Sequence, residues 1–566
     1  MLCLLQPASE YGKNICPKIP EYVPGKLYYK APEKHLSDSF VEQRGDELLI
    51  LEGIIANGKR LVNAYAAQDL KDLLWQATKD TSILGKLHGY FFAARYNVVS
   101  GEFRIFTGPA SSVRLYYYHQ GDTIIVADKI KTIVDVLAAS GVQCSVSDLG
   151  ARMILSYGYM LEGFTTIKEV KQLPSASCLS YVRGRLEEKR YFSWNFEIRH
   201  QANHKCYREL TQLLTAAVSD AFERDENYEH LAFLSGGLDS RMVVYIADKL
   251  GYKGFSVLSI SEPGYLDATI AADIAKELGL KLHFSSLEGG EYLYGLGENL
   301  QYHEGQIVMH GAAHLFQALQ DMPLERYGIL HSGQIGDIVK GTYLAGRTHT
   351  PVNPVAAAYS TTILQRFSSE LGFVREKYPN HEAFVLYNRG LNGMINGDLA
   401  TYHFSHSLSA FTEPEFMQYA LNIDPAKRYD SRAYLAWMNY SFPVAARHTW
   451  EKTGARASDP YWFVKLKYNV WRGSDTIKRM ITKQPNRLTM NPFDYWWQSN
   501  AELRAHLNQE FSCLQEVAPF LDKELQADMN ELFQSSSLSV KLQAYTLARS
   551  ILYLLGKEDK IEVSHD

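Results

Sequence analysis

The segment SGGLDS at residues 235–240 constrains the fold of this chain more than any other feature of its sequence. It follows the apolar run HLAFL at 230–234 and precedes RMVVYIADKL at 241–250, whose apolar residues recur at helical spacing. Two adjacent glycines let the backbone turn tightly and let a ligand approach closely. The N–H groups at the start of the helix, together with the helix dipole, favour an anion there. The segment therefore predicts a phosphate-binding loop between a buried strand and a helix.

The polar residues of this loop fit the same interpretation. Ser235 and Ser240 add hydroxyl donors, whereas Asp239 adds a negative charge that would repel a phosphate. The carboxylate makes sense if it holds a Mg²⁺ ion that neutralises the phosphate. The alternative is a glycine-rich turn in which Asp and Ser merely cap a helix. The position of the loop in an alternating run of strands and helices favours the phosphate site.

That alternation sets the expected domain organisation. Residues 203–345 alternate short apolar strands with amphipathic helices, which predicts a parallel sheet with helices on both faces. Residues 1–195 are rich in short β-branched and aromatic runs, with helices near 65–79 and 146–158, and predict an α+β domain of antiparallel sheets. Residues 346–566 read mainly as helices. We expect one domain over 1–195 and a second over 203–566, divided into a 203–345 core and a helical extension.

Composition excludes several classes of protein. The chain has 566 residues, which at roughly 150 residues per domain allows two to four domains. The 58 Lys and Arg and 63 Asp and Glu give a net charge of −5, which argues against a nucleic-acid partner. The sequence contains no run of about 18 apolar residues, so no membrane span is expected. The six cysteines include no CxxC pair, so neither a zinc site nor a disulfide framework is expected. A reducing cytoplasm is the simplest location, and a homodimer is left open.

Several motifs resemble one family. SGGLDS resembles the PP-loop of N-type ATP pyrophosphatases, and SGQIGDIVKGTY at 332–343 resembles the SGEGADELFGGY element of the asparagine synthetase family. The runs LHGYFFAARYNVVSGEFRIFTG, ADKIKTIVDVL and TTIKEVKQLPSASCLSY resemble the glutaminase half of that family. The resemblance covers most of residues 40–345 and, more loosely, 346–500. It implies a glutaminase-like Ntn-type sandwich followed by a doubly wound α/β parallel sheet of the PP-loop (HUP-like) type with a helical C-terminal region.

The resemblance also implies the ligands and the residues that bind them. ATP and Mg²⁺ are the expected cofactors, with Asp239 and Asp337 as the metal ligands, because Asp337 falls on the family's second Mg²⁺/pyrophosphate aspartate. The nucleotide-binding residues are then expected to be Ser235, Gly236, Gly237, Asp239, Ser240, Leu258, Ser332 and Gly333.

The glutaminase half departs from the family at two positions. A glutaminase of this type uses an N-terminal cysteine, whose thiol attacks and whose α-amine acts as base. Here the chain begins Met-Leu-Cys, so Cys3 becomes N-terminal only after an additional cleavage. The family's Asn-Gly pair, which supplies an oxyanion donor, aligns with Glu52-Gly53, and an ionised carboxylate accepts hydrogen bonds and repels an oxyanion. We expect an inactive glutaminase domain, as in β-lactam synthetase and lasso-peptide cyclase; a processed Cys3 is the alternative.

The acceptor side departs as well. The family's glutamate in SGEGAD is replaced by Gln334, which cannot act as a base. His406 in HSLSAFTEPEF falls where a later glutamate is expected, with Glu413 at the aspartate position, so His406 is either a base or an ordinary buried or exposed histidine. The family's charge-stabilising lysine is assigned to Lys483. The segment NPFDYWW at 491–497 belongs to the core or lines the acceptor pocket. The competing lysines are Lys465, Lys467 and Lys478.

These features predict an ATP-dependent, AMP- and pyrophosphate-forming amide ligase. Its substrates would be a small-molecule or peptide carboxylate and an amine or ammonia. Two alternatives stay open: a glutamine-hydrolysing asparagine synthetase with processed Cys3, and a non-catalytic nucleotide-binding scaffold.

Overall fold

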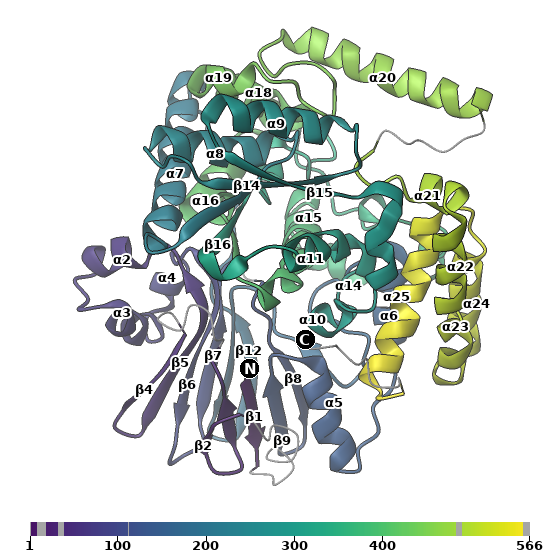
Figure 1. Cartoon of the computed structure of the whole chain (residues 1–566). Coiled ribbons are helices and arrows are strands. Elements are labelled where there is room, and N and C mark those ends of the chain that lie inside the picture. Colours follow the sequence, from purple (N-terminus) through teal and green to yellow (C-terminus); the bar gives the residue numbers. More distant parts are fainter. Residues whose placement is uncertain (1, 8–18, 32–38, 111, 483–488, 558–566) are drawn as a thin grey trace.

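The computed structural model describes residues 2–7, 19–31, 39–110, 112–482 and 489–557. An antiparallel β-sandwich forms the N-terminal part, and a parallel sheet flanked by helices lies above it in the view of Figure 1. Helices from the C-terminal region lie along one side of both parts. Within the described part of the chain, no helix is both long and apolar enough to span a membrane.

The N-terminal part contains two six-stranded antiparallel sheets. The first has the order β10-β8-β9-β1-β3-β2, and the second has the order β12-β11-β7-β6-β5-β4. Apolar residues from both sheets share one core, which is how two stacked sheets bury their inner faces. The strands are β1 (Leu2–Gln6), β2 (Glu21–Val23), β3 (Leu27–Tyr29), β4 (Phe40–Arg44), β5 (Glu47–Ile55), β6 (Gly89–Asn97), β7 (Phe103–Thr107), β8 (Tyr116–Gln120), β9 (Thr123–Ala127), β10 (Lys171–Gln172), β11 (Ser177–Val182) and β12 (Arg185–Arg190).

Helices cover the outer face of each of these sheets. One outer cluster packs the first sheet against α5, and another packs the second sheet against α3 and its neighbours. The result is an α–β–β–α sandwich, which confirms the α+β fold expected for this part of the chain. The helices are α2 (Gly58–Ala64), α3 (Leu70–Ala77), α4 (Thr81–Leu84), α5 (Ile130–Ala139) and α6 (Asp148–Tyr157).

The second part is built on a parallel sheet with the order β15-β14-β13-β16-β17. The chain runs outward from β13 to β15 on one side and then continues from β16 to β17 on the other. Neighbouring residues of β13 point to opposite faces: Ala232 joins the main core, and Leu231 joins a second cluster with α11. The strands are β13 (Glu229–Phe233), β14 (Ser256–Ser261), β15 (Lys281–Ser286), β16 (Tyr327–Ser332) and β17 (Ser407–Ser409).

Helices lie on both faces of this sheet, as the alternation in the sequence predicts (Figure 1). The edge strand β17, however, comes from the segment after residue 345, which the sequence assigns to the helical extension. Only three residues long, β17 carries too short a pattern to be recognised. The helices of this region are α7 (Asn203–Arg224), α8 (Leu238–Lys249), α9 (Leu266–Leu278), α10 (Leu300–His303), α11 (Ala313–Gln320) and α12 (Asp337–Lys340).

The remainder of the chain is mainly helical, as expected. Its last helix, α25, packs against α6 and α5 of the N-terminal part, so the two ends of the described chain are joined in one core. The helices are α13 (Leu364–Phe367), α14 (Gly372–Lys377), α15 (His381–Val385), the π-helix η5 (Leu386–Met394), α16 (Pro414–Leu421), α17 (Pro425–Arg428), α18 (Arg432–Ser441), α19 (Pro443–Ala446), α20 (Tyr461–Thr482), α21 (Phe493–Ser499), α22 (Ala501–Glu510), α23 (Cys513–Val517), α24 (Lys523–Phe533) and α25 (Leu538–Leu554).

Candidate active site

A cavity of about 310 Å³ opens where the strand order of the parallel sheet reverses. It lies beyond the carboxyl ends of β13 and β16, the place where open α/β sheets bind their ligands. The structure brings most of the expected nucleotide-binding residues into its wall, together with the expected acceptor-side residue Gln334. They are Ser235, Gly237, Asp239, Ser240, Leu258, Ser332, Gly333 and Gln334.

The SGGLDS loop is held from both sides. The Gly236 N–H donates to Asp267 Oδ1 at 2.5 Å, and the Gly236 carbonyl accepts from Arg241 Nη2 at 3.0 Å. The buried Arg241 guanidinium also donates to the Thr449 carbonyl at 2.6 Å, which ties the loop to the segment after α19. Burial lowers the pKa of Arg241 to about 10, so the guanidinium stays charged at neutral pH.

The two expected metal-binding aspartates are joined by a lysine. Lys340 Nζ lies 2.5 Å from Asp239 Oδ2 and 3.0 Å from Asp337 Oδ1. Burial opposes the charge of Lys340, but the two carboxylates outweigh it and raise its pKa. Burial also raises the pKa of Asp239, partly offset by Lys340, whereas for Asp337 the lysine prevails over burial and the pKa falls below its ordinary value. The three side chains therefore form one buried, charge-compensated cluster.

The turn after β16 packs directly against the start of α8. A Cβ atom on Gly333 would lie 2.4 Å from Ser240 N, and one on Gly336 would lie 2.3 Å from Asp239 Cγ. Only glycine permits such an approach, because no side chain separates the two backbones. This contact brings the two motifs, about one hundred residues apart in sequence, into a single site.

Several buried polar atoms of this cavity have no hydrogen-bond partner among the described residues. They include Asp239 Oδ1, Ser332 Oγ and Gln334 Oε1. Native structures rarely leave such atoms unpaired, so an unpaired cluster indicates a place for a polar ligand. Within the described chain, no group of three or more His, Cys, Asp or Glu residues could hold a metal. Two aspartates suit Mg²⁺, which is commonly held by one or two carboxylates together with substrate phosphates.

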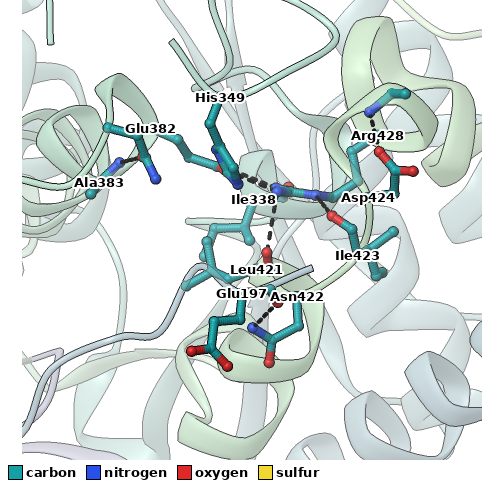
Figure 2. A network of polar contacts seen from close by, with 12 residues as sticks. Glu197, Ile338, His349, Glu382, Ala383, Leu421, Asn422, Ile423, Asp424 and Arg428 are labelled. Atoms are coloured by element: carbon teal, nitrogen blue, oxygen red, sulfur yellow. Dashed lines mark hydrogen bonds and ion pairs between the residues drawn. The ribbon is translucent and has the colours of Figure 1, made fainter. Parts of the chain in front are cut away.

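A buried ion pair supports the helix that carries Asp337 and Lys340 (Figure 2). Arg428 pairs with Glu382 through both Nη atoms, and both side chains are fully buried. Arg428 Nη1 also donates to the Ile338 carbonyl at 2.9 Å, so the ion pair holds the backbone of α12. The guanidinium thereby helps to hold the helix from which Asp337 and Lys340 contact Asp239, the member of the cluster that lines the cavity.

Gln334 forms a hydrogen bond with Asp398, an acidic residue that the sequence does not single out. Its Nε2 donates to Asp398 Oδ1 at 3.1 Å and to the Met394 carbonyl at 3.4 Å. Asp398 lines the same cavity, and its Oδ2 has no hydrogen-bond partner in the described part of the chain. Burial raises the pKa of Asp398 to about 7, with the Gln334 hydrogen bond acting in the opposite direction. This carboxyl group can therefore exchange a proton near neutral pH.

The other expected acceptor-side residues lie elsewhere. The His406 ring packs edge-on against Tyr402 at 4.5 Å, outside the residues that line the cavity. Glu413 caps α16 by accepting from Phe416 N at 2.8 Å and pairs with Arg60 at 3.2 Å. Glu413 thus joins the two parts of the molecule, and neither His406 nor Glu413 lines the cavity with Gln334.

The candidate lysines are not brought to the cavity either. Lys483 and the side chain of Lys478 lie outside the described residues. Lys465 pairs with Asp430 at 2.6 Å, and Lys467 donates to the Gly454 carbonyl at 2.9 Å. Lys340 does not line the cavity itself, but it contacts Asp239, which does. Its spacing of three residues from Asp337 on one helix was the signal available in the sequence.

The aromatic segment at 491–497 packs behind the cavity. Trp496 is fully buried, and its Nε1 donates to Glu262 Oε2 at 3.2 Å. Asn491 accepts from the Tyr292 hydroxyl at 3.0 Å, and the neighbouring Met490 reaches the wall of the nucleotide cavity. The segment packs behind the cavity, in agreement with the core interpretation.

In the N-terminal part, the place of the expected oxyanion donor is filled. Glu52 is 3% exposed and accepts from the hydroxyls of Tyr29 and Tyr402, each at 2.6 Å. Successive residues of a strand face opposite sides. Leu2 and Leu4 of β1 face the core between the two sheets, whereas Cys3 faces the cluster beneath α5. Cys3 therefore lies on the other side of the sheet from Glu52 and its tyrosines.

Comparisons with known proteins agree with this geometry. Residues 209–389 match a family model described as asparagine synthase. The matched segment contains the SGGLDS loop, the glycine turn after β16 and the Asp239–Lys340–Asp337 cluster. The matched family implies an ATP-dependent ligase. Over these residues the chain is similar to the asparagine synthase family, as its motifs predict.

Solved structures are similar at low identity. "Structure of the allosteric regulatory enzyme of purine biosynthesis" is 11% identical, with 44% of this chain and 62% of that chain covered and a TM-score of 0.20. Glutamine phosphoribosylpyrophosphate amidotransferase from B. subtilis is 13% identical, with 44% and 73% covered and a TM-score of 0.20. NMN synthetase from Francisella tularensis is 16% identical, with 40% and 97% covered and a TM-score of 0.18. The chain spans less than two thirds of the first of these structures. No curated protein sequence matches the chain.

Proposed function

We propose that this protein is an ATP-dependent amide ligase that forms AMP and pyrophosphate. In the proposed reaction, a substrate carboxylate attacks the α-phosphorus of ATP and displaces pyrophosphate. An amine or ammonia then attacks the resulting acyl-adenylate and displaces AMP. The carboxylate belongs to a small molecule or a peptide.

The observation that carries the proposal is the Asp239–Lys340–Asp337 cluster at the edge of the switch-point cavity. A scaffold that only packed against its neighbours would not need two buried aspartates beside an unpaired Asp239 Oδ1. When bound, Mg²⁺ would neutralise the phosphate charge, and Asp239 and Asp337 are the residues that would hold it. Lys340 compensates their charge in the described state and is placed to pair with a phosphate oxygen.

We assign the proton transfer from the incoming amine to Asp398. A base acts most effectively when its pKa lies near the working pH, and burial raises the pKa of Asp398 to about 7. The Gln334 amide holds one oxygen of this carboxyl group, which leaves Oδ2 directed to accept the proton. Asp398 replaces His406 in this proposal because Asp398 lines the cavity.

Two observations argue against glutamine as the nitrogen source. Glu52 is engaged by two tyrosine hydroxyls, and Cys3 lies on the opposite face of its sheet from Glu52. We therefore propose that the N-terminal domain is a structural part of the enzyme and that the amine arrives from solution.

The experiment that tests the proposal follows pyrophosphate and AMP release from Mg²⁺-ATP with pooled candidate carboxylates, with and without glutamine. We expect release that depends on a carboxylate, does not change with glutamine and is lost in Asp239→Asn. Hydrolysis of glutamine by a chain that begins at Cys3 would instead support an amidotransferase. Absence of ATP binding would support a scaffold.

A further inference from the structure

A second cavity, of about 380 Å³, adjoins the nucleotide cavity. Met394 lines the second cavity, and its carbonyl accepts from Gln334, which lines the first. Gly397 and Asp398, neighbours in sequence, also line one cavity each. The two spaces are therefore separated by a thin wall that includes Gln334 and Asp398.

The second cavity is built where the N-terminal part meets the rest of the chain. Val308 N donates to the Gly158 carbonyl at 2.9 Å, and Tyr159 forms an antiparallel bridge with Ile307. Met309 N donates to Thr546 Oγ1 at 3.1 Å, which fixes this wall to α25. The opposite wall is the π-helix η5, an irregular form of helix that is frequent at functional sites.

The described lining contains one charged side chain, Arg389 on η5. Its guanidinium makes no hydrogen bond or ion pair with another residue that the structure describes. Its charge contributes to the lowered pKa of Asp337, so the guanidinium acts within electrostatic range of the proposed phosphate site. An arginine in this position offers a paired, planar set of donors to a carboxylate.

The lining also contains buried polar atoms without partners in the described chain. Gln543 of α25 is 0% exposed, and neither its Oε1 nor its Nε2 has a hydrogen-bond partner. His310 is buried, its Nδ1 has no partner, and burial lowers its pKa to about 4, so the ring is neutral at pH 7. A burial of this kind costs free energy unless a ligand supplies the missing hydrogen bonds.

Much of the remaining surface is aromatic. Tyr157, Tyr159 and Tyr359 line the cavity, and Tyr359 is 61% exposed, which is unusual for a large ring. Gly393 and Gly397 also line the cavity, and Gly393 packs close to the Tyr159 ring. Rings presented in this way pack well against a flat ring of a ligand.

We propose that this cavity binds the carboxylate substrate, and that the substrate is an aromatic carboxylic acid. This assignment rests on the proposed ligase function for its role in the reaction. Arg389 pairs with the carboxylate and directs it toward the nucleotide cavity, the tyrosines hold the ring, and Gln543 bonds a polar group on it. A free amino acid fits less well, because the described lining offers no Asp or Glu to pair with an α-ammonium group. The cavity volume of about 380 Å³ also lies within the range of roughly 300–1,000 Å³ that is usual for small-molecule pockets.

Equilibrium binding to the full chain tests the assignment. The probes are 4-hydroxyphenylacetate and indole-3-acetate, each compared with its primary amide, and aspartate serves as the amino-acid probe. We expect the acids to bind about threefold to fivefold more tightly than their amides, as a charge pair of about 1 kcal/mol at the exposed Arg389 allows. Arg389→Gln should remove this preference, and Gln543→Leu should weaken both acid and amide. The matched control is Arg375→Gln, an exposed arginine of α14 outside the cavity, which should bind as the unmodified chain does.

Equal binding of acid and amide, an unchanged preference in Arg389→Gln, tighter binding of aspartate, or no binding of either acid would each overturn the assignment. Thermal unfolding of each variant confirms that the fold is retained. Binding of Mg²⁺-ATP is measured in parallel. If ATP binds and the aromatic acids do not, this assignment fails and the ligase proposal stands. If the acids bind through Arg389 and ATP does not, the ligase proposal fails and the cavity remains an aromatic-acid site.

Discussion

Glu52 and Asp239 are both buried carboxylates, but their oxygens are paired differently. Glu52 accepts a hydrogen bond at each oxygen from a tyrosine, one of them in the N-terminal part and the other, Tyr402, in the part built on the parallel sheet. Asp239 has one oxygen on Lys340 and leaves the other without a partner in the described chain. Buried polar groups that are fully paired stabilise a fold, and unpaired ones await a ligand. The contrast separates a carboxylate that joins two parts of the molecule from one that lines a cavity with an oxygen unpaired among the described residues.

The largest expected effect comes from the close approach that builds the nucleotide site. In Gly333→Ala, the new Cβ would lie 2.4 Å from Ser240 N, so the turn after β16 must move away from α8. Displacement of a catalytic group by about 1 Å costs about 100-fold in rate. We expect pyrophosphate release to fall by about that factor. The control is Gly346→Ala, whose Cβ meets no atom within 4 Å. Equal rates for the two variants would show that the contact does not matter.

The ion pair beneath the site should matter next. Glu382→Gln leaves Arg428 as a buried charge without its carboxylate partner, and breaking such a pair costs about 3–5 kcal/mol. Denaturant unfolding measures the change. Glu229→Gln, which breaks the exposed pair with Arg326, should cost about 0–1 kcal/mol. A small loss in Glu382→Gln would mean that the ion pair does not support α12.

Substitution of Glu52 should lower the free energy of unfolding and leave nucleotide binding unchanged. Glu52→Ala leaves the Tyr402 hydroxyl without its acceptor, at about 1–3 kcal/mol for a buried unsatisfied group, whereas the Tyr29 hydroxyl keeps the Leu51 carbonyl at 3.1 Å. Glu52→Gln keeps an acceptor and should lose less. If folded Glu52→Ala no longer bound Mg²⁺-ATP, the surroundings of Glu52 could not be regarded as independent of the cavity that Asp239 lines.

The smallest effect is a pH dependence at Asp398. Burial raises its pKa from 3.8 to about 7, so the folded state favours the protonated form. The stability that this form contributes is fully present below about pH 4 and is lost as the pH rises through about 7. Asp398→Asn keeps the neutral form. We expect the variant to be more stable than the unmodified chain at pH 8 by at least about 1 kcal/mol, the equivalent of one pKa unit. The difference should shrink at pH 5, and equal stability at both pH values would contradict the assignment.

The sequence predicts the parts of the site that depend on local pattern. A strand, two glycines and a helix at 235–240 can be recognised without distant contacts, and so can the turn that follows β16. The alternation of Leu2, Cys3 and Leu4 along β1 could also have been read as a strand, with Cys3 on the opposite face. The sequence shows that Glu52 departs from the family pattern. It does not show that Glu52 accepts a hydrogen bond from Tyr402, because Tyr402 lies 350 residues away in the sequence.

The site residues that the sequence does not predict are brought together by packing between segments far apart in the chain. Asp398 lies in a run of short, irregular helices with no clear period, and only the fold brings it to Gln334. The sequence leaves His406 as either a base or an ordinary histidine, and in the structure its ring packs against Tyr402. Arg389 and Gln543 come from elements far apart in the chain and meet only in the second cavity.

The most direct test of the account is calorimetric titration of the full chain with Mg²⁺-ATP, beside Asp239→Asn and Cys3→Ser. The account predicts that the unmodified chain and Cys3→Ser bind the nucleotide alike, and that Asp239→Asn loses Mg²⁺-dependent binding. Equal binding by Asp239→Asn, or no binding by the unmodified chain, would contradict the claim that the synthetase part alone keeps its ligand site.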